Sequence, residues 1–184
     1  MRSLRFGEDD EALNPEDRII LAVPPQAAAQ LLPKLTLPLS SCTIVNAHFR
    51  LDRPVTLPGG APLVGLIGGT AQWLFARADV VAVTVSAADQ LANKPVAEIA
   101  ETLWLDVARA MALGGAAMPP HRIVKEQRAT FAQTPTEVAR RPGPNAADLA
   151  NLVLAGDWTA TGLPATIEGS VRSGRRAVAS LASR

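Results

Sequence analysis

Apolar residues recur along the chain with two different periods, and each period predicts a type of element. Runs that alternate every second residue, or that are short and continuously apolar, predict buried strands. They occupy residues 18–23, 42–51, 63–67, 72–76, 78–86, 121–131 and 152–155. Apolar residues spaced by three or four positions predict helices at residues 26–32, 95–113 and 165–181. The polar residues 1–16 predict a partly stranded lead-in, and the proline-rich residues 135–144 predict a loop.

This order of elements predicts an α+β fold. The strands between residues 42 and 86 follow one another across short connections, two of which contain Gly or Pro, and this is typical of an antiparallel sheet. The run 78–86 is rich in β-branched residues and should lie centrally in that sheet. The helix at 95–113 then supplies a long apolar stripe that can cover one face of the sheet.

The strand at 42–51 has two different faces. Val45, Ala47 and Phe49 lie on the apolar face, and His48 lies on the polar face. The apolar face could be an ordinary core face or the wall of a site for an apolar ligand, because the two look the same in sequence. His48 could donate a proton or contact a substrate, although a histidine at such a position is more often solvated.

The region that carries most chemical information runs from Asn151 to Leu181, and it predicts a strand, a tight turn and a helix. Gly156 ends the apolar strand, Asp157 stands at its exit, and Pro164 suits the first position of the helix. Unpaired N–H groups at a helix start favour electron-rich ligand atoms. The pattern therefore predicts a site for a polar, partly anionic, planar group, with ordinary α/β packing as the alternative.

The helix at 165–181 has two ridges that differ in side-chain size. The apolar ridge consists of Ile167, Val171, Val178 and Leu181. The ridge of small residues consists of Thr166, Ser170, Ser173, Gly174 and Ala177. Each glycine inside a helix costs roughly 1 kcal/mol relative to alanine. Gly169 and Gly174 therefore indicate that another backbone or a flat ligand approaches this helix closely.

Composition narrows the class of protein. Of the 184 residues, 48% are hydrophobic, which excludes general disorder, and the net charge of +1 gives no case for nucleic acid binding. A single cysteine and two histidines make a metal centre or a conventional catalytic triad improbable. The N-terminal residues lack the apolar core of a signal peptide, and no apolar run reaches the ~18–20 residues of a membrane helix. We therefore expect a cytoplasmic chain.

The motif L-A-G-D-W-T-A-T-G-L-P-A-T-I-E-G-S, at residues 154–170, resembles the flavin-contacting segment of the FAD-dependent amine oxidase and phytoene desaturase superfamily. Within that superfamily it is most similar to the hydroxysqualene dehydroxylase family. The resemblance implies that the Gly-Asp turn meets the ribityl-pyrophosphate part of FAD and that the Glu-Gly helix start lies beside the isoalloxazine ring. The residues given a cofactor role in this way are Gly156, Asp157, Trp158, Thr166, Ile167, Glu168 and Gly169.

Two further segments resemble the same family, D-R-I-I-L-A-V-P-P-Q at residues 17–26 and R-A-T-F at residues 128–131. The resemblance implies a FAD-domain segment at 1–25, a substrate-binding domain at 26–145 and a C-terminal FAD-binding segment at 146–184. The family's G-x-G-x-x-G motif, which holds the ADP half of FAD, is missing from this sequence. We therefore expect either a truncated product or a chain that needs a partner carrying the N-terminal FAD-binding half.

The implied reaction is the reductive removal of the hydroxyl group of hydroxysqualene to give squalene. Such a long isoprenoid needs an apolar tunnel, and it could draw the protein into peripheral contact with the inner membrane. No residue is assigned as acid or base. The alternatives are a carotenoid desaturase, an amine oxidase, or a non-catalytic interaction module without cofactor. The absence of tyrosine argues against the aromatic cage that amine oxidases usually have.

Overall fold

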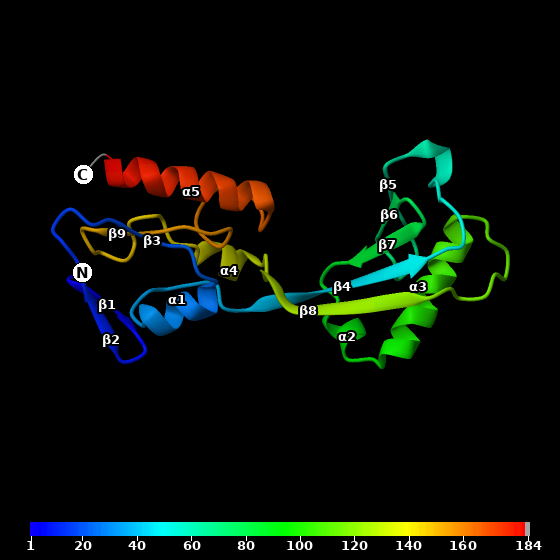
Figure 1. Cartoon of the computed structure of the whole chain (residues 1–184), viewed down its shortest axis with the longest axis horizontal. Coiled ribbons are helices and arrows are strands. Elements are labelled where there is room, and N and C mark those ends of the chain that lie inside the picture. The colour runs from blue at the N-terminus through cyan, green and yellow to red at the C-terminus, as the bar shows by residue number, and fades with distance from the viewer. Residues whose placement is uncertain (183–184) are drawn as a thin grey trace. The chain divides into compact units, whose positions relative to one another are not determined.

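The computed structural model describes residues 1–182, and the chain divides into two compact units. Unit 1 is formed by Met1–Ser40 together with Phe131–Arg184, and unit 2 is formed by Ser41–Thr130. The chain thus leaves unit 1, completes unit 2, and returns (Figure 1).

Unit 1 is built around a parallel pair of short strands. Strand β3 (Ile19–Leu21) pairs in parallel with β9 (Leu152–Leu154), although more than one hundred residues separate them in sequence. The other elements are an antiparallel hairpin and three helices. These are β1 (Ser3–Phe6), β2 (Asp9–Ala12), α1 (Pro25–Leu31), α4 (Pro135–Ala139) and α5 (Ile167–Ala182).

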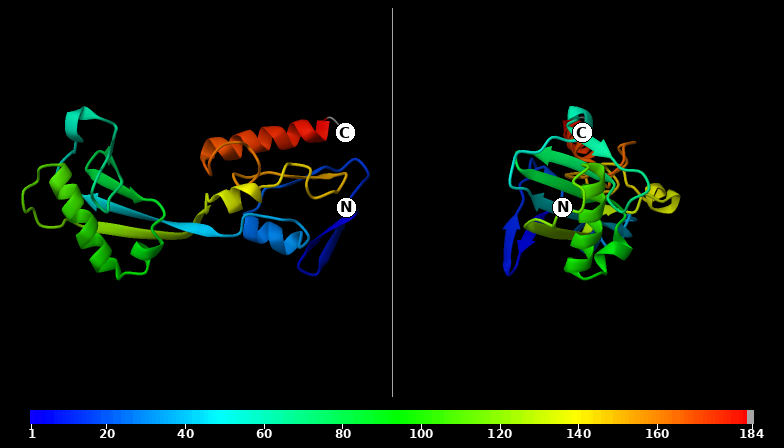
Figure 2. Two further views of the ribbon diagram at one scale, coloured as in Figure 1. Left: turned by 180° about the vertical axis from the view of Figure 1, so that it is seen from behind. Right: turned by 90° about the vertical axis from the view of Figure 1, so that its right-hand side faces the viewer.

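Strand β9 is buried on both faces because helices cover it on opposite sides. Leu152 and Leu154 pack into a cluster with Ala28 of α1. Val153 packs on the other side with Ala177 of α5. Figures 1 and 2 show α1 and α5 on opposite sides of the β3–β9 pair. A parallel strand covered on both faces reads as a continuous apolar run, which is why this strand was predictable.

Helix α5 turns mainly small residues toward β9, in agreement with the predicted close approach to this helix. Gly169, Ser173 and Ala177 are the buried residues of the helix, whereas Ile167 and Val178 are exposed. Small side chains let the helix axis lie close to β9. The helix also begins at Ile167, three residues after Pro164, so the prediction of Pro164 at its first position is wrong.

Unit 2 is a five-stranded sheet with helices on one face. The strand order is β5-β6-β7-β4-β8, and neighbouring pairs from β5 to β4 are antiparallel. The strands are β4 (Ser41–Arg50), β5 (Leu63–Gly65), β6 (Trp73–Arg77), β7 (Val80–Val85) and β8 (His121–Phe131), the last residue of which belongs to unit 1. The helical segments are η1 (Pro58–Gly60), α2 (Asp89–Ala92) and α3 (Val96–Ala110). Every predicted strand is present, whereas the short helix α2 was not predicted.

The core of unit 2 lies between the sheet and α3. Val45, Ala47 and Phe49 of β4 have no exposed surface and share one cluster with Leu103 and Val107 of α3. These three β4 residues therefore form an ordinary core face, and the prediction that they could line a ligand tunnel is wrong. The opposite face of the sheet is the one that reaches solvent, because Leu63, Trp73 and Phe75 are exposed there.

The predicted three-segment organisation differs from the compact units in its boundaries. The units divide at residues 40/41 and 130/131, since α1 and α4 pack within unit 1. The assignment of segments 1–25, 26–145 and 146–184 to cofactor and substrate stays a prediction, and residues 183–184 lie outside the described part. Within residues 1–182, no helix has the length and apolar character needed to cross a membrane.

Candidate functional site

The predicted site residues gather where strands β3 and β9 end. Val23 follows β3 and Gly156 follows β9, and the indole N–H of Trp158 donates to the carbonyl oxygen of Val23 at 3.0 Å. The two carboxyl ends are therefore tied together. In open sheets with parallel strands, ligands bind beyond the carboxyl ends of the strands. The topology thus makes this end of unit 1 the candidate site.

Gly156 has a backbone conformation that requires glycine. Its φ is +143°, and a Cβ atom there would collide with the indole of Trp158. Its N–H donates to the Ser173 hydroxyl at 3.0 Å, and its carbonyl oxygen accepts from the Thr159 hydroxyl at 2.9 Å. The two hydroxyls also contact each other at 2.7 Å. The turn is therefore bonded directly to the small-residue face of α5.

Asp157 is a half-buried carboxylate within this turn. Burial raises its pKa above the ordinary value. Backbone N–H donors from Trp158 and from Asp157 itself, and the charge of Arg141, lower the pKa and so oppose that shift. A carboxylate kept partly out of water is a strong hydrogen-bond acceptor for hydroxyl groups of a ligand. Asp157 could therefore accept from ligand hydroxyls.

Trp158 lies in the core of unit 1. Only 2% of its surface is exposed, and its ring packs with Ala28, Leu152 and Leu154. The predicted contact between Trp158 and a cofactor stays a prediction, but it would have to use the backbone, because the side chain is enclosed.

The start of α5 presents the remaining predicted residues. Thr166 caps the helix, since its Oγ1 accepts from the N–H of Gly169 at 3.0 Å. Gly169 is buried, and a Cβ on it would lie 2.9 Å from the carbonyl oxygen of Pro164. Close approach to its own chain therefore accounts for this glycine. Ile167 and Glu168 are exposed, and the Glu168 carboxylate lies 3.5 Å from Arg172.

Arg141 is a site residue that sequence reasoning missed. It lies beside Arg140 in the proline-rich residues 135–144, where sequence alone favours a solvated pair over one near an anionic group. Instead its guanidinium donates to the carbonyl oxygens of Asp157 and Leu163 at 2.8 and 2.7 Å. It also donates to the Thr161 hydroxyl at 3.0 Å. Helix α4 ends two residues before Arg141 and could have been predicted from the pattern T-P-T-E at residues 134–137. In the structure the Thr134 hydroxyl caps this helix by accepting from the N–H of Glu137.

These groups fit part of a flavin. The Asp157 carboxylate can accept from ribityl hydroxyls. The N–H groups of Gly169 and Ser170 are bonded to Thr166, so those of Ile167 and Glu168 are the ones at the start of α5 that can donate to ring carbonyl oxygens. A glycine-rich turn for a pyrophosphate is absent from the sequence. The fit therefore extends to the ribityl and ring portions of the cofactor, and the adenosine half has no matching residues in this chain.

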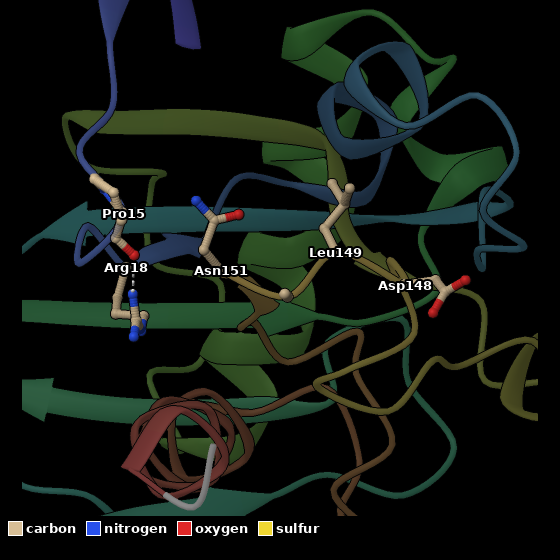
Figure 3. Close-up of a pocket in the computed structure, with 6 residues that line it drawn as sticks. Pro15, Arg18, Asp148, Leu149 and Asn151 are labelled. Carbon is tan, nitrogen blue, oxygen red and sulfur yellow. Dashed lines mark hydrogen bonds between the residues drawn. The ribbon is translucent and has the colours of Figure 1, made fainter. Parts of the chain in front are cut away.

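A hollow at the opposite end of the β3–β9 pair is not the site. It encloses about 590 Å³ and is lined by Arg18 and Asn151, which immediately precede the two strands, and by Pro15, Asp148 and Leu149 (Figure 3). Arg18 there donates to the carbonyl oxygen of Pro15. None of the predicted cofactor residues lines this hollow, which lies at the amino ends of the strands.

Residues 3–182 match the model of the flavin containing amine oxidoreductase family, and the chain belongs to this family. Membership implies a flavin as the cofactor.

Curated relatives are similar to this chain over nearly all of its length. It is 53% identical over 174 residues to hydroxysqualene dehydroxylase from Sinorhizobium fredii, a match that covers 95% of this chain and 40% of the relative. It is 50% identical over 176 residues to hydroxysqualene dehydroxylase from Rhodopseudomonas palustris, which covers 95% of this chain and 41% of the relative. The chain therefore spans about two fifths of the length of the curated relatives it matches.

A solved structure supports the fold. A putrescine oxidase with redesigned cofactor binding superposes with a TM-score of 0.64 at 13% identity, covering 99% of this chain and 46% of that one. The predicted α+β class, an antiparallel sheet with helices beside the last strand–turn–helix of a cofactor domain, is confirmed.

Proposed function

We propose that this chain forms part of a FAD-dependent oxidoreductase that reductively removes the hydroxyl group of hydroxysqualene to give squalene. The observation that carries the proposal is the match to hydroxysqualene dehydroxylases at 50–53% identity across 95% of the chain. That stretch includes the whole turn and helix start described above. The likeness to a putrescine oxidase concerns the fold alone and does not favour an amine substrate.

The proposed cofactor is FAD, held at the carboxyl ends of β3 and β9. Gly156 and Asp157 would contact the ribityl-pyrophosphate portion, and Glu168 and Gly169 would lie beside the ring. The remaining proposed contacts are Trp158, through its backbone, together with Thr166 and Ile167. When bound, the flavin supplies the hydride that replaces the hydroxyl group. The large exposed surface of Ile167, 87%, supports a role as an apolar contact, because a fully solvated isoleucine has no folding benefit.

The proposed substrate surface is the exposed face of the unit 2 sheet. Leu63, Trp73 and Phe75 lie on neighbouring strands β5 and β6, and Leu63 pairs directly with Phe75. The ring of Trp73 lies over Gly65, since a Cβ there would be 3.3 Å from the ring. An apolar isoprenoid binds by burying hydrocarbon surface, and these three residues offer aromatic and aliphatic side chains, with Arg77 exposed two positions beyond Phe75 on the same strand. Peripheral contact with a membrane, where such a substrate dissolves, belongs to the same proposal.

We propose that a second chain carrying a G-x-G-x-x-G unit completes the FAD site. Two features support this. The parallel sheet of unit 1 has only two strands within residues 1–182, and Ile20 in β3 is 42% exposed. Parallel sheets are normally covered on both faces and contain more strands. In addition, more than half the length of each curated relative lies outside the match.

The test is reconstitution. The 184-residue chain is purified alone and after coexpression with a dinucleotide-binding segment corresponding to the unmatched part of a relative, and its visible absorbance is recorded with and without FAD. We expect flavin absorbance in the complex and conversion of hydroxysqualene to squalene by the reduced complex. A flavin-loaded complex that leaves hydroxysqualene unchanged would disprove the substrate. A parallel screen with carotenoid precursors and amines would identify the alternative reactions.

A further inference from the structure

The connection between β9 and α5 has to keep its shape without regular secondary structure. Residues 155–166 contain neither helix nor strand, yet they carry the Gly156-Asp157 turn. Most of the contacts that hold the connection come from outside it. On the α5 side, Ser173 bonds the turn, and the Arg176 guanidinium donates to the carbonyl oxygen of Ala160 at 2.9 Å.

On the other side, one side chain contacts the connection at three points. The guanidinium of Arg141 donates to Asp157 O, Thr161 Oγ1 and Leu163 O at distances of 2.7 to 3.0 Å. The same Thr161 oxygen also accepts from the N–H of Leu163 at 3.2 Å. The planar guanidinium of Arg141 therefore contacts both ends of the segment from Asp157 to Leu163.

Arg141 is itself held in place. Its guanidinium carbon lies 5.1 Å from the centre of the Phe131 ring, which favours a cation over the ring face. The backbone that follows it is also fixed, because Ala160 N–H donates to the carbonyl oxygen of Pro142 at 2.9 Å. The Nε of Arg141 is buried and has no partner among residues 1–182. The side chain thus gives up hydration at Nε while its terminal nitrogens bond the turn.

The contacts continue from the turn to the helix start. Leu163 and Pro164 are the neighbours that a Cβ on Gly169 would meet outside its own helix backbone, together with Thr166. Fixing Leu163 relative to Asp157 therefore fixes the spacing between the Gly-Asp turn and the beginning of α5. None of the three bonds uses the Asp157 carboxylate, which stays available as an acceptor.

We propose that Arg141 is the positioning residue of the segment 157–163, holding the Gly-Asp turn and the start of α5 at a fixed spacing. The importance of that spacing for flavin rests on the proposed function. Lysine cannot replace arginine here, because an ammonium is a single point of charge and cannot span three acceptors with the geometry of a planar fork. Arg141 does not contact the reacting atoms and is not a catalytic residue.

The experiment is hydrogen–deuterium exchange, read by mass spectrometry, on the full 184-residue chain. The variants are Arg141→Lys and Arg141→Ala, and the control is Arg175→Lys, which changes an exposed arginine of α5. In both Arg141 variants we expect amides of residues 157–163 to exchange on the order of 10-fold faster, as local opening becomes easier. Peptides from β3, β9 and unit 2 should keep wild-type rates, as should the whole control protein. Methylguanidinium added to Arg141→Ala should slow exchange of residues 157–163 again.

Other outcomes overturn the proposal. Unchanged exchange in residues 157–163 would mean that the three bonds do not determine the shape of the segment. Equal acceleration across β3 and β9, or loss of folded unit 1 in both variants, would mean that Arg141 supports the fold generally. The measurement needs no flavin. A wild-type chain that fails to bind FAD would therefore count against the proposed function and leave the result for Arg141 standing.

Discussion

The two units bury different chemistry. Unit 2 is held by large apolar side chains, with Phe49, Leu103 and Trp104 between sheet and helix. Unit 1 has a short sheet, small residues against α5, and hydroxyls such as those of Thr159 and Ser173 buried and bonded to one another. Apolar packing is tolerant of shape, whereas a buried hydrogen-bond network depends on each partner. The geometry of unit 1 therefore depends more closely on individual residues than that of unit 2, and unit 1 carries the candidate cofactor site.

The two units also differ in how the fold affects an ionised carboxylate, Asp89 in unit 2 and Asp157 in unit 1. Asp89 in unit 2 accepts from the hydroxyl and the N–H of Thr43 at 2.8 and 3.0 Å, and these bonds lower its pKa. Burial instead raises the pKa of Asp157 in unit 1. The ionised form is stabilised by the fold in one unit and disfavoured in the other. Because the fold disfavours the ionised side chain of Asp157, stability does not explain why an aspartate occupies this position.

The largest expected effect tests whether apolar packing dominates unit 2. Leu103→Ala should destabilise the chain by about 2–5 kcal/mol, because the side chain is fully buried and leaves a cavity. Leu105, two residues along the same helix, is 65% exposed, and Leu105→Ala should change stability by less than about 0.5 kcal/mol. Urea denaturation measures both. A similar small change for both variants would contradict the comparison.

The second largest effect tests whether the stability of unit 1 depends on backbone geometry. Gly156→Ala should cost at least about 1–3 kcal/mol, the usual cost of a strained backbone conformation. The collision with Trp158 adds to it. Gly174 lies in α5 with no neighbour within 4 Å of an added Cβ, so Gly174→Ala should instead stabilise the helix by up to about 1 kcal/mol. Thermal unfolding distinguishes them, and equal shifts in both variants would refute the geometric explanation.

Opposite pH dependence is expected for the two carboxylates. The raised pKa of Asp157 gives a stabilisation that is complete below the unfolded value of about 3.9 and is lost as pH rises through the folded pKa. Asp157→Asn should therefore raise the melting temperature at pH 7, while weakening FAD binding. The lowered pKa of Asp89 gives a stabilisation that is present above about 3.9 and is lost as pH falls through the folded pKa. Asp89→Asn should therefore lower the melting temperature at pH 7.

Solvent screening limits both expected changes in melting temperature, because Asp89 is exposed and Asp157 is only half-buried. Scanning calorimetry of both variants at pH 7 and near pH 4 checks the signs. At the lower pH the difference between each variant and the wild type should shrink. A melting temperature that falls in Asp157→Asn would show that the carboxylate is needed for the fold of the turn.

The smallest expected effect on stability concerns the exposed sheet face of unit 2. Trp73 is 44% exposed, while Trp104 and Trp158 are buried. Dispersed squalene should shift the fluorescence of the wild-type chain to shorter wavelength, since Trp73 would be covered. Trp73→Phe should abolish that shift and change stability by no more than about 0.5 kcal/mol. A shift that persists in the variant would place the ligand elsewhere.

Prediction from the sequence also succeeded to different degrees in the two units. In unit 2 every predicted strand is present, because period-two patterns and β-branched runs report burial directly. In unit 1 the strand and helix of the C-terminal region were predicted, and the close approach expected at Gly169 is confirmed, since a Cβ there would lie 2.9 Å from the carbonyl oxygen of Pro164. The close approach expected at Gly174 is wrong, because an added Cβ there has no neighbour within 4 Å. Residue identity alone cannot tell which glycine of a helix lies against another part of the backbone.

The candidate site shows the limits more sharply. Gly156, Asp157 and Thr166 were identified from a motif, and the contacts described here give each a physical role within the chain. Arg141 was not identified, because its acceptors lie 16 to 22 residues away in sequence and two of them are backbone carbonyl groups. Backbone acceptors leave no trace in residue identity, so only the folded turn could show what this arginine binds.

The points where the chain leaves unit 1 and re-enters it have a modular consequence. The Ala132 N–H donates to the carbonyl oxygen of Ser40 at 2.7 Å, so departure and return are neighbours. Unit 2 is thus an insertion into unit 1 at a single junction. A hairpin linker of about two to five residues could close that junction after its removal. Replacement of the inserted unit could then leave strands β3 and β9 of unit 1 undisturbed.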